Sequence, residues 1–344
     1  MIKALAVLAL LAACGGKTEP QQPTKKDDGG VAKPAEDAAA NVTLAPAPPL
    51  PVVPAGLPPV ELPATVTPEA VALGELLFWD SRLSIHGKQS CATCHDPAHG
   101  YASAKRMETA AGKLFPRRAP TLVNLAWHKE LGWDGRYSSM GEFLDAHVKN
   151  QLGDDLGTAV ARIAEVPGYR AHFTRVGGVA AAADALAAFT LTRYAGSTWD
   201  RVERNPDAPA NLKAGYTLFQ NKAQCSVCHT PPLYTDLRFH RMGLVASPDE
   251  GRGRVDAAAK GAFKTPSLRG VATRTGFFHD ASAASLDAAI DWHLAGGTGQ
   301  GADPSIVDPA LKKLVLTAAE REQLAAFVQA LSDDQPAAKP PTLP

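Results

Sequence analysis

Four of the five cysteines fall into two copies of the pattern Cys-x-x-Cys-His, at 91–95 and at 225–229. This pattern is the attachment signature of c-type haem, in which both thiols add to the haem vinyl groups and the adjacent histidine binds the iron. A zinc ribbon would need its cysteine pairs about 15–20 residues apart, and a thioredoxin-like pair needs a βαβ setting that is absent. We therefore expect two covalently bound c-type haems, held by Cys91, Cys94 and His95 and by Cys225, Cys228 and His229.

The two copies must be presented by a folded body, and the sequence predicts that this body is mostly helical. Thr67-Pro68-Glu69 has the form of a capped helix start, and Thr317-Ala318-Ala319-Glu320 has the form of a capping box. No run alternates convincingly enough to predict a strand. Besides the helices that begin at 67 and 317, we expect helices at 138–150, 157–166, 179–194, 208–221 and 285–295.

The composition limits the partners and the organisation of the chain. The 35 basic and 35 acidic residues cancel, so nothing attracts a nucleic acid. Residues 15–66 hold 11 of the 28 prolines, which is typical of an extended segment without a core. We expect a disordered tether at 14–66, two domains at 67–200 and 201–333 with one haem motif each, and a disordered tail at 334–344.

The first residues resemble an export signal. Lys3 is followed by an apolar run that is too short to span a bilayer, and the run ends in Leu11-Ala12-Ala13-Cys14. That ending resembles the lipobox of bacterial lipoproteins, in which the cysteine is acylated and the chain is cut before it. We expect a signal peptide at 1–13 and a periplasmic protein anchored to a membrane by lipid at Cys14. An ordinary signal peptide, with Cys14 incidental, is the alternative.

Besides the two haem motifs, several short runs between Leu73 and Leu331 are distinctive, namely 76–84 (LLFWDSRLS), 118–122 (RAPTL), 133–136 (WDGR), 266–269 (PSLR), 277–280 (FFHD) and 294–297 (LAGG). In these runs and their order, the chain resembles the bacterial di-haem cytochrome c peroxidases and MauG, which modifies tryptophans of a partner protein. The resemblance implies an all-α fold of two tandem cytochrome-c-like domains. It also implies that His95 binds the iron of a peroxide-reacting haem and His229 that of an electron-transfer haem.

Three functions are compatible with this resemblance. The first is reduction of hydrogen peroxide to water, with electrons from a small periplasmic donor protein entering through the second haem. The second is MauG-like oxidation of side chains in a partner protein, and the third is electron transfer without catalysis. Family members often pair as homodimers, which is an option for this chain too.

The second iron ligands should differ between the haems, because peroxide needs an open face and electron transfer does not. Family peroxidases often place a first-haem histidine in a loop that corresponds to 107–112, and no histidine occurs there. His99 and His128 are nearby but are expected to be surface or supporting residues. At the second haem the family has Met or Tyr where this chain has His293, which we expect to be a ligand, with Met242 as its rival.

The resemblance also suggests residues for proton and electron movement. The family's acid–base Glu corresponds most nearly to Asp155, beside Asp154, although the position is shifted by two residues. Trp133 matches a tryptophan that lies between the haems, and Arg136 is a candidate for a haem propionate. His279 is expected to be structural.

Calcium is the one family ligand that we do not expect. The family binds the ion between its domains with an Asn side chain and backbone carbonyls. Arg118 stands at the Asn position, and its positive charge would repel a dication or take its place.

Overall fold

The computed structural model describes residues 44–244, 249–298, 306–333 and 337–344. The expected signal peptide at 1–13, the lipid anchor at Cys14 and the tether as far as residue 43 lie outside the described residues. Within the described part, no helix is both long and apolar enough to cross a membrane.

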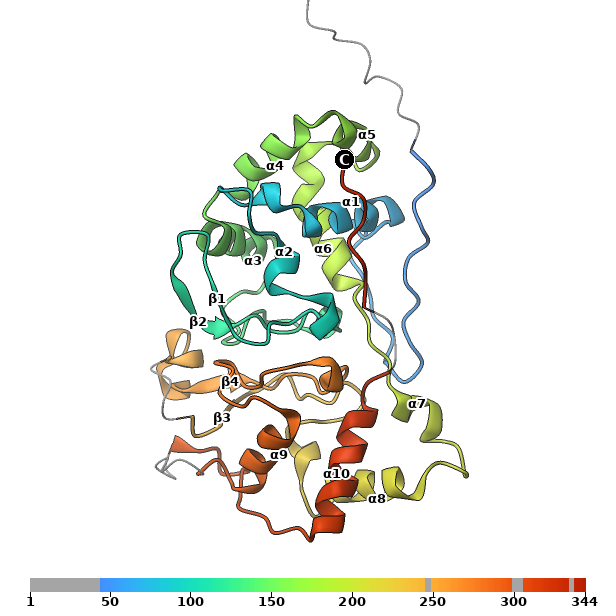
Figure 1. Ribbon diagram of the computed structural model, residues 1–344, viewed down its shortest axis with the longest axis vertical. Coiled ribbons are helices and arrows are strands. Elements are labelled where there is room, and N and C mark those ends of the chain that lie inside the picture. The colour runs from blue at the N-terminus through green and yellow to red at the C-terminus, as the bar shows by residue number, and fades with distance from the viewer. Residues whose placement is uncertain (1–43, 245–248, 299–305, 334–336) are drawn as a thin grey trace, which may run out of the picture. The chain divides into compact units, whose positions relative to one another are not determined.

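Helices dominate the regular structure of the described residues (Figure 1). Every helix that the sequence predicted is present, and side-chain caps explain several boundaries. Thr67 caps the first of these helices, and the reciprocal bonds of Thr317 and Glu320 begin the last. The α-helices are α1 (Pro68–Trp79), α2 (Cys91–Cys94), α3 (Met140–His147), α4 (Leu156–Ala164), α5 (Arg170–Arg175), α6 (Ala182–Leu191), α7 (Thr198–Val202), α8 (Ala210–Gln220), α9 (Leu286–Leu294) and α10 (Ala318–Ala330).

Two pairs of packed helices form the centre of the fold, and the helices of each pair are in contact through a glycine. Helix α1 packs on α6, and helix α8 packs on α10. Each crossing depends on a glycine: a Cβ at Gly74 would lie 1.9 Å from the Ala185 carbonyl oxygen, and one at Gly215 would lie 2.1 Å from the Gln323 carbonyl oxygen. The absence of a side chain therefore lets the two backbones of each pair touch.

Each helix pair contributes to its own hydrophobic cluster. One cluster extends from Leu73 to Phe189 and the other from Trp199 to Leu331. Residues 42–344 nevertheless form a single compact unit by their contacts. The division into domains at 67–200 and 201–333 accordingly stays a prediction.

The sequence predicted a mostly helical body without indicating a strand, and the described residues are mostly helical but also form two small antiparallel sheets. They consist of β1 (Arg106–Glu108) with β2 (Leu114–Arg118) and of β3 (Phe239–Arg241) with β4 (Ala262–Lys264). Strands of three to five residues are too short to show an alternating pattern in a sequence. Their backbones join the two sequence halves: Arg118 N–H donates to the His279 carbonyl, and Lys264 N–H donates to the Trp133 carbonyl.

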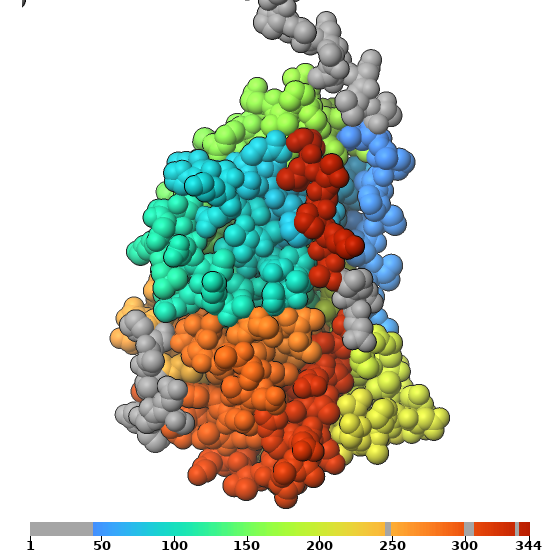
Figure 2. Space-filling view, viewed as in Figure 1, coloured from blue at the N-terminus to red at the C-terminus, as the bar shows by residue number. Residues whose placement is uncertain are grey.

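Both proline-rich segments touch the folded body where they are described. Leu50 and Leu62 pack with Val66 on α1 and α6. At the other end, the Pro344 carbonyl accepts a hydrogen bond from Arg82 at 3.0 Å, and Leu343 packs on the first hydrophobic cluster. Figure 2 shows this C-terminal segment lying along the surface of the first half. Residues 44–66 and 337–344 thus differ from the expected disordered tether and tail.

The glycine at the α8–α10 crossing gives a first testable prediction. Gly215→Ala should lower the free energy of unfolding by about 1–3 kcal/mol, because the added methyl group must push two backbones apart. Gly141→Ala on α3 is the matched control: nothing lies within 4 Å of its added Cβ. Denaturant unfolding followed by circular dichroism measures both, and equal stability of the two variants would contradict this account of the crossing.

Candidate active site

Each Cys-x-x-Cys-His motif lies in the wall of a cavity, and the second motif lies in the larger of the two. This cavity encloses about 1610 Å³, its opening to solvent included, and Cys225, Cys228 and His229 all line it. The imidazole of His229 is fixed through Nδ1, which lies 3.1 Å from the Tyr234 carbonyl oxygen. A carbonyl accepts only a protonated nitrogen, so this contact leaves Nε2 unprotonated and available to a metal.

His293 lies across this cavity from His229. It is on α9, and its Nδ1 lies 2.7 Å from the Ala289 carbonyl oxygen, one turn earlier. The two ring centres are 6.2 Å apart. A metal bound at about 2 Å by one nitrogen of each ring would separate the centres by roughly 6 Å. The spacing therefore suits one iron held from both sides. Met242 lines the same cavity and remains a rival ligand.

Burial keeps both imidazoles in the form that binds metal. Burial and the neighbouring His293 lower the pKa of His229 to about 4, and burial also lowers the pKa of His293. Neutral imidazole is the ligating species, so neither ring needs to lose a proton at neutral pH.

The first motif lines a smaller cavity, of about 650 Å³, and its histidine is fixed in the same way. Cys91, Cys94 and His95 are in the wall, and His95 Nδ1 lies 3.0 Å from the Tyr101 carbonyl oxygen. Among the described residues the motif thiols form no disulfide, and burial raises the pKa of Cys91 and of Cys225 to about 12. Two reduced thiols beside a neutral, oriented imidazole in a mostly apolar cavity are the donor set that a c-type haem requires, and both cavities provide it.

His147, which no sequence pattern singled out, also lines the smaller cavity. It is the last residue of α3, directly before the π-helical turn Val148–Leu152. Its Nδ1 lies 2.9 Å from the Phe143 carbonyl oxygen, and its ring centre lies 4.0 Å from that of Phe143. Among the described residues it makes no ring contact with His95, in contrast to the pair in the larger cavity. Its place on the same helix face as Phe143 was the available signal.

The loop at 107–112, which corresponds to the one that holds an iron-binding histidine in many of the peroxidases that this chain resembles, lies beside this cavity. Ala110 N–H donates to the carbonyl of Gln151, and Gln151 lines the cavity. His99 is bonded to Asp96, and His128 lies 3.3 Å from Lys264 Nζ. Neither histidine lines either cavity.

The structure does not bring Asp155 to the smaller cavity. Its side chain is exposed and accepts a hydrogen bond from Thr158 N–H at 3.1 Å, so it serves as the N-cap of α4. Asp154 forms an ion pair with Arg162. Apart from the cysteines and His95, His147 is the only titratable side chain among the described residues that line this cavity.

Trp133 lies between the two sequence halves. Its side chain is buried and lines the larger cavity, its Nε1 donates to the Arg118 carbonyl at 2.9 Å, and its ring centre lies 6.5 Å from that of His279. Arg136, which was a candidate for binding a haem propionate, lines neither cavity. Its side chain forms an ion pair with Asp134 instead.

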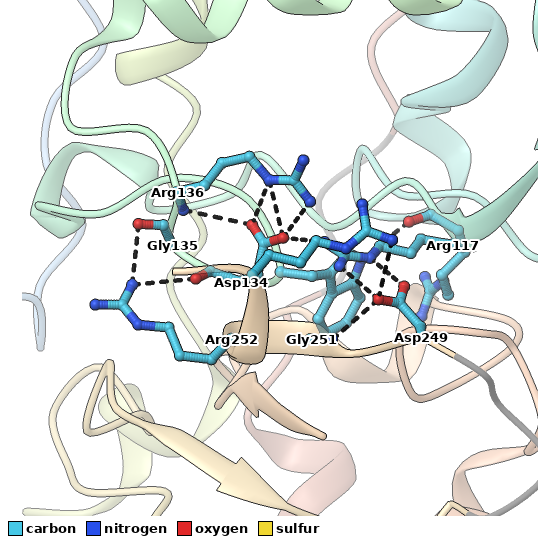
Figure 3. A network of polar contacts seen from close by, with 10 residues as sticks. Arg117, Asp134, Gly135, Arg136, Asp249, Gly251 and Arg252 are labelled. Atoms are coloured by element: carbon cyan, nitrogen blue, oxygen red, sulfur yellow. Dashed lines mark hydrogen bonds and ion pairs between the residues drawn. The ribbon is translucent and has the colours of Figure 1, made fainter. Parts of the chain in front are cut away.

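A buried ion network holds Asp134, the residue that follows Trp133 in the chain (Figure 3). Arg117 donates to Asp249 through Nε and Nη2 at 2.5 and 2.8 Å and to Asp134 through Nη1 at 2.9 Å. Burial opposes ionisation of Asp249, but hydrogen bonds from Arg117 and Gly251 lower its pKa to about 2. The network therefore joins residues 132 positions apart in the chain.

Comparison with known proteins places these features in a family. A family model described as di-haem cytochrome c peroxidase matches residues 68–208. The methylamine utilization protein MauG of Methylorubrum extorquens is 35% identical over 299 residues, which are 81% of this chain and 82% of that protein. The cytochrome-c peroxidase IdrP1 of Denitromonas iodatirespirans is 32% identical, over 81% of this chain and 86% of its own. A crystal structure of a MauG-like protein associated with microbial copper homeostasis has a TM-score of 0.72 and 25% identity, covering 82% of this chain and 95% of that one.

The ion network predicts a defined dependence of stability on pH. The pKa of Asp249 in the folded protein lies below its value of about 3.9 in an unfolded chain, so its contribution is complete above pH 4 and is lost as the pH falls towards 2. Asp249→Asn should cost about 3–5 kcal/mol of unfolding free energy at pH 7, because Arg117 loses a buried partner, and less at pH 2. Denaturant titrations at both pH values test this. The exposed Asp145→Asn is the control, and a pH-independent difference for Asp249→Asn would refute the assignment.

The ring pair in the larger cavity predicts a spectroscopic change. His293→Ala should convert one haem from a low-spin to a high-spin ferric signal in electron paramagnetic resonance, because one of two imidazole ligands is removed. The covalent haem content, measured as the pyridine haemochrome, should stay at two per chain. If Met242 were the ligand instead, the low-spin signal would persist in this variant and disappear in Met242→Ala.

Proposed function

Because the chain belongs to the di-haem cytochrome c peroxidase family, which includes MauG, we propose that it reduces hydrogen peroxide to water with electrons entering through the second haem. The observation that carries this proposal is the difference between the two cavities. The rings of His229 and His293 have the spacing of two ligands to one iron. Burial and the neighbouring His95 lower the pKa of His147 to about 4, but the two rings make no contact among the described residues. One haem is therefore suited to electron transfer and the other to a substrate.

The smaller cavity supplies binding and proton transfer. The haem, when bound, supplies the redox chemistry, and His95 holds it by a neutral nitrogen. Apolar side chains that include Phe78, Leu125 and Leu186 line the space and exclude water from the reacting peroxide. His147 is the side chain that can take the proton from one peroxide oxygen and return it to the other, a role that histidine fills more often than any other residue. We assign this role to His147 in place of Asp155.

Residues between the cavities suit electron transfer towards the first haem. Trp133 is buried, and its indole is fixed by a hydrogen bond to the Arg118 carbonyl. The adjacent Asp134 is held by Arg117, so the indole cannot easily change position. We propose Trp133 as the electron relay and His293 as the ligand that completes the electron-transfer site.

A second candidate function is MauG-like oxidation of side chains in a partner protein. It is favoured by the 35% identity to a MauG and by His293, because imidazole in place of methionine lowers the haem potential and makes oxidised states easier to reach. Here peroxide would supply both oxidising equivalents without a donor protein. A carrier without catalysis is the third candidate, and it requires His147 to bind the first iron.

We also propose two tandem cytochrome-c-like domains, covalent attachment of both haems, a periplasmic location with a lipid anchor at Cys14, and no requirement for calcium. The partner is a small electron-donor protein or an oxidisable protein, and a homodimer is compatible with the family.

Stoichiometric peroxide added to the oxidised holoprotein tests the central claim. The wild type should react without prior reduction, and His147→Gln should slow this reaction by about 10²–10⁴-fold, because a positioned acid–base group contributes that much. Stopped-flow absorbance measures the rate. His172→Gln is the matched control, since His172 is half-buried on α5 and lines neither cavity.

The same variant separates the candidate functions. If His147 were an iron ligand, His147→Gln would change a low-spin signal to high-spin and would accelerate the reaction with peroxide, which supports the carrier. Consumption of peroxide with reduced horse-heart cytochrome c as donor supports the peroxidase. A stable oxidised state that this donor does not discharge supports the MauG-like function.

A further inference from the structure

Two arginines in the larger cavity stand apart from the other deeply buried arginines. Arg118, at the end of β2, is 5% exposed, and Arg274 is 7% exposed; both line the cavity. Arg117 is paired with Asp134 and Asp249, and Arg269 is paired with Asp200 at 2.6 Å. Neither Arg118 nor Arg274 pairs with a carboxylate of the described residues.

Their hydrogen bonds use only part of each guanidinium. Arg118 donates through Nε to the Ser103 carbonyl at 2.7 Å, and no described group accepts from its two Nη nitrogens. Arg274 donates through Nη1 to the Ser267 carbonyl at 2.8 Å and through Nη2 to the Arg269 carbonyl. Its Nε is buried without a partner. Donors therefore remain on both side chains in a cavity with a mostly apolar lining.

This arrangement is costly unless an anion is present. Burial lowers the pKa of Arg118 to about 10, and burial together with the charge of Arg118 lowers the pKa of Arg274 to about 9. The two cations are thus close enough to repel each other. Buried charges are almost always paired, and a guanidinium matches a carboxylate with two parallel hydrogen bonds.

We propose that Arg118 and Arg274 bind the carboxylates of the haem attached to Cys225 and Cys228. This inference rests on the proposed haem at that motif, which lines the same cavity. Two cations match the two propionates that a haem carries. Since Arg118 comes from the first half of the chain and the cysteines from the second, the haem is held by both halves.

The two guanidinium charges also bear on the potential of the second haem. A positive charge beside a haem favours the reduced iron, because reduction adds an electron. The two arginines therefore raise the potential of the second haem and oppose the effect of His293.

The test measures the potential of the low-spin haem in the complete holoprotein by spectroelectrochemistry. Arg118→Gln and Arg274→Gln should each shift the ferric–ferrous equilibrium about tenfold towards ferric, which is a potential about 59 mV lower. Arg118→Lys, which keeps the charge, should restore most of the potential. Arg162→Gln is the control, because Arg162 is paired with Asp154 and lines neither cavity.

A second measurement addresses the haem carboxylates directly. Cells fed with 5-aminolevulinate that carries ¹³C in its carboxyl group label the propionates, and infrared difference spectra on reduction then identify their bands. Arg118→Lys and Arg274→Lys should shift these labelled bands, and Arg162→Gln should not. These milder variants keep the proposal testable if the glutamine variants do not accumulate.

The outcomes separate this inference from the proposed function, because neither measurement uses peroxide. Unchanged labelled bands, or a shift of the equilibrium below twofold with both haems attached, would overturn the inference. Shifted bands in a protein whose wild type is inert to peroxide would uphold it and reject the proposed peroxidase.

Discussion

One buried cation between two carboxylates determines how the two halves of this chain meet. Arg117 is hydrogen-bonded to Asp134 from its own half and to Asp249 from the other, and all three side chains are buried. Because a buried charge is costly without its partners, this junction tolerates little displacement. Trp133 directly precedes Asp134, and Arg118 directly follows Arg117. The Trp133 indole donates a hydrogen bond to the Arg118 carbonyl, and both residues line the larger cavity. The geometry of the larger cavity thus depends on an ion network that lies outside it.

The two cavities show how one design yields two chemical tasks. In both, a Cys-x-x-Cys-His motif follows a helix with a glycine contact, and the imidazole Nδ1 is bonded to a backbone carbonyl five or six residues later. The difference lies in the opposite wall. Helix α9 presents His293 with its ring centre 6.2 Å from that of His229, whereas His147, at the end of α3, makes the same kind of carbonyl bond as His293 but packs with its ring tilted against Phe143. The position of α9 therefore places a second imidazole opposite His229.

The features that were predictable from the sequence are those that depend on neighbouring residues. The motif cysteines, the helix caps at Thr67 and Thr317, and the position of His293 before a glycine pair are local patterns, and the structure contains each of them. His147 was missed because its spacing from Phe143 shows only that the two share a face of α3, and helix periodicity does not report which cavity that face lines. Arg136 matched a family motif, but its charge is used by Asp134, two residues away. An ion pair of that kind depends on the folded backbone.

The electrostatics of the larger cavity bear on which function the fold serves. Two imidazole ligands lower the potential of a haem relative to an imidazole and a thioether. Taken alone, His293 would make this haem a weak acceptor for electrons from a high-potential donor. Arg118 and Arg274 act in the opposite sense, because both positive charges lie in the same cavity and favour the reduced iron. A ligand that stabilises the ferric state combined with cations that stabilise the ferrous state leaves the potential intermediate. A haem of that kind can accept an electron from a small cytochrome and still pass it across Trp133, which is the requirement of a peroxidase.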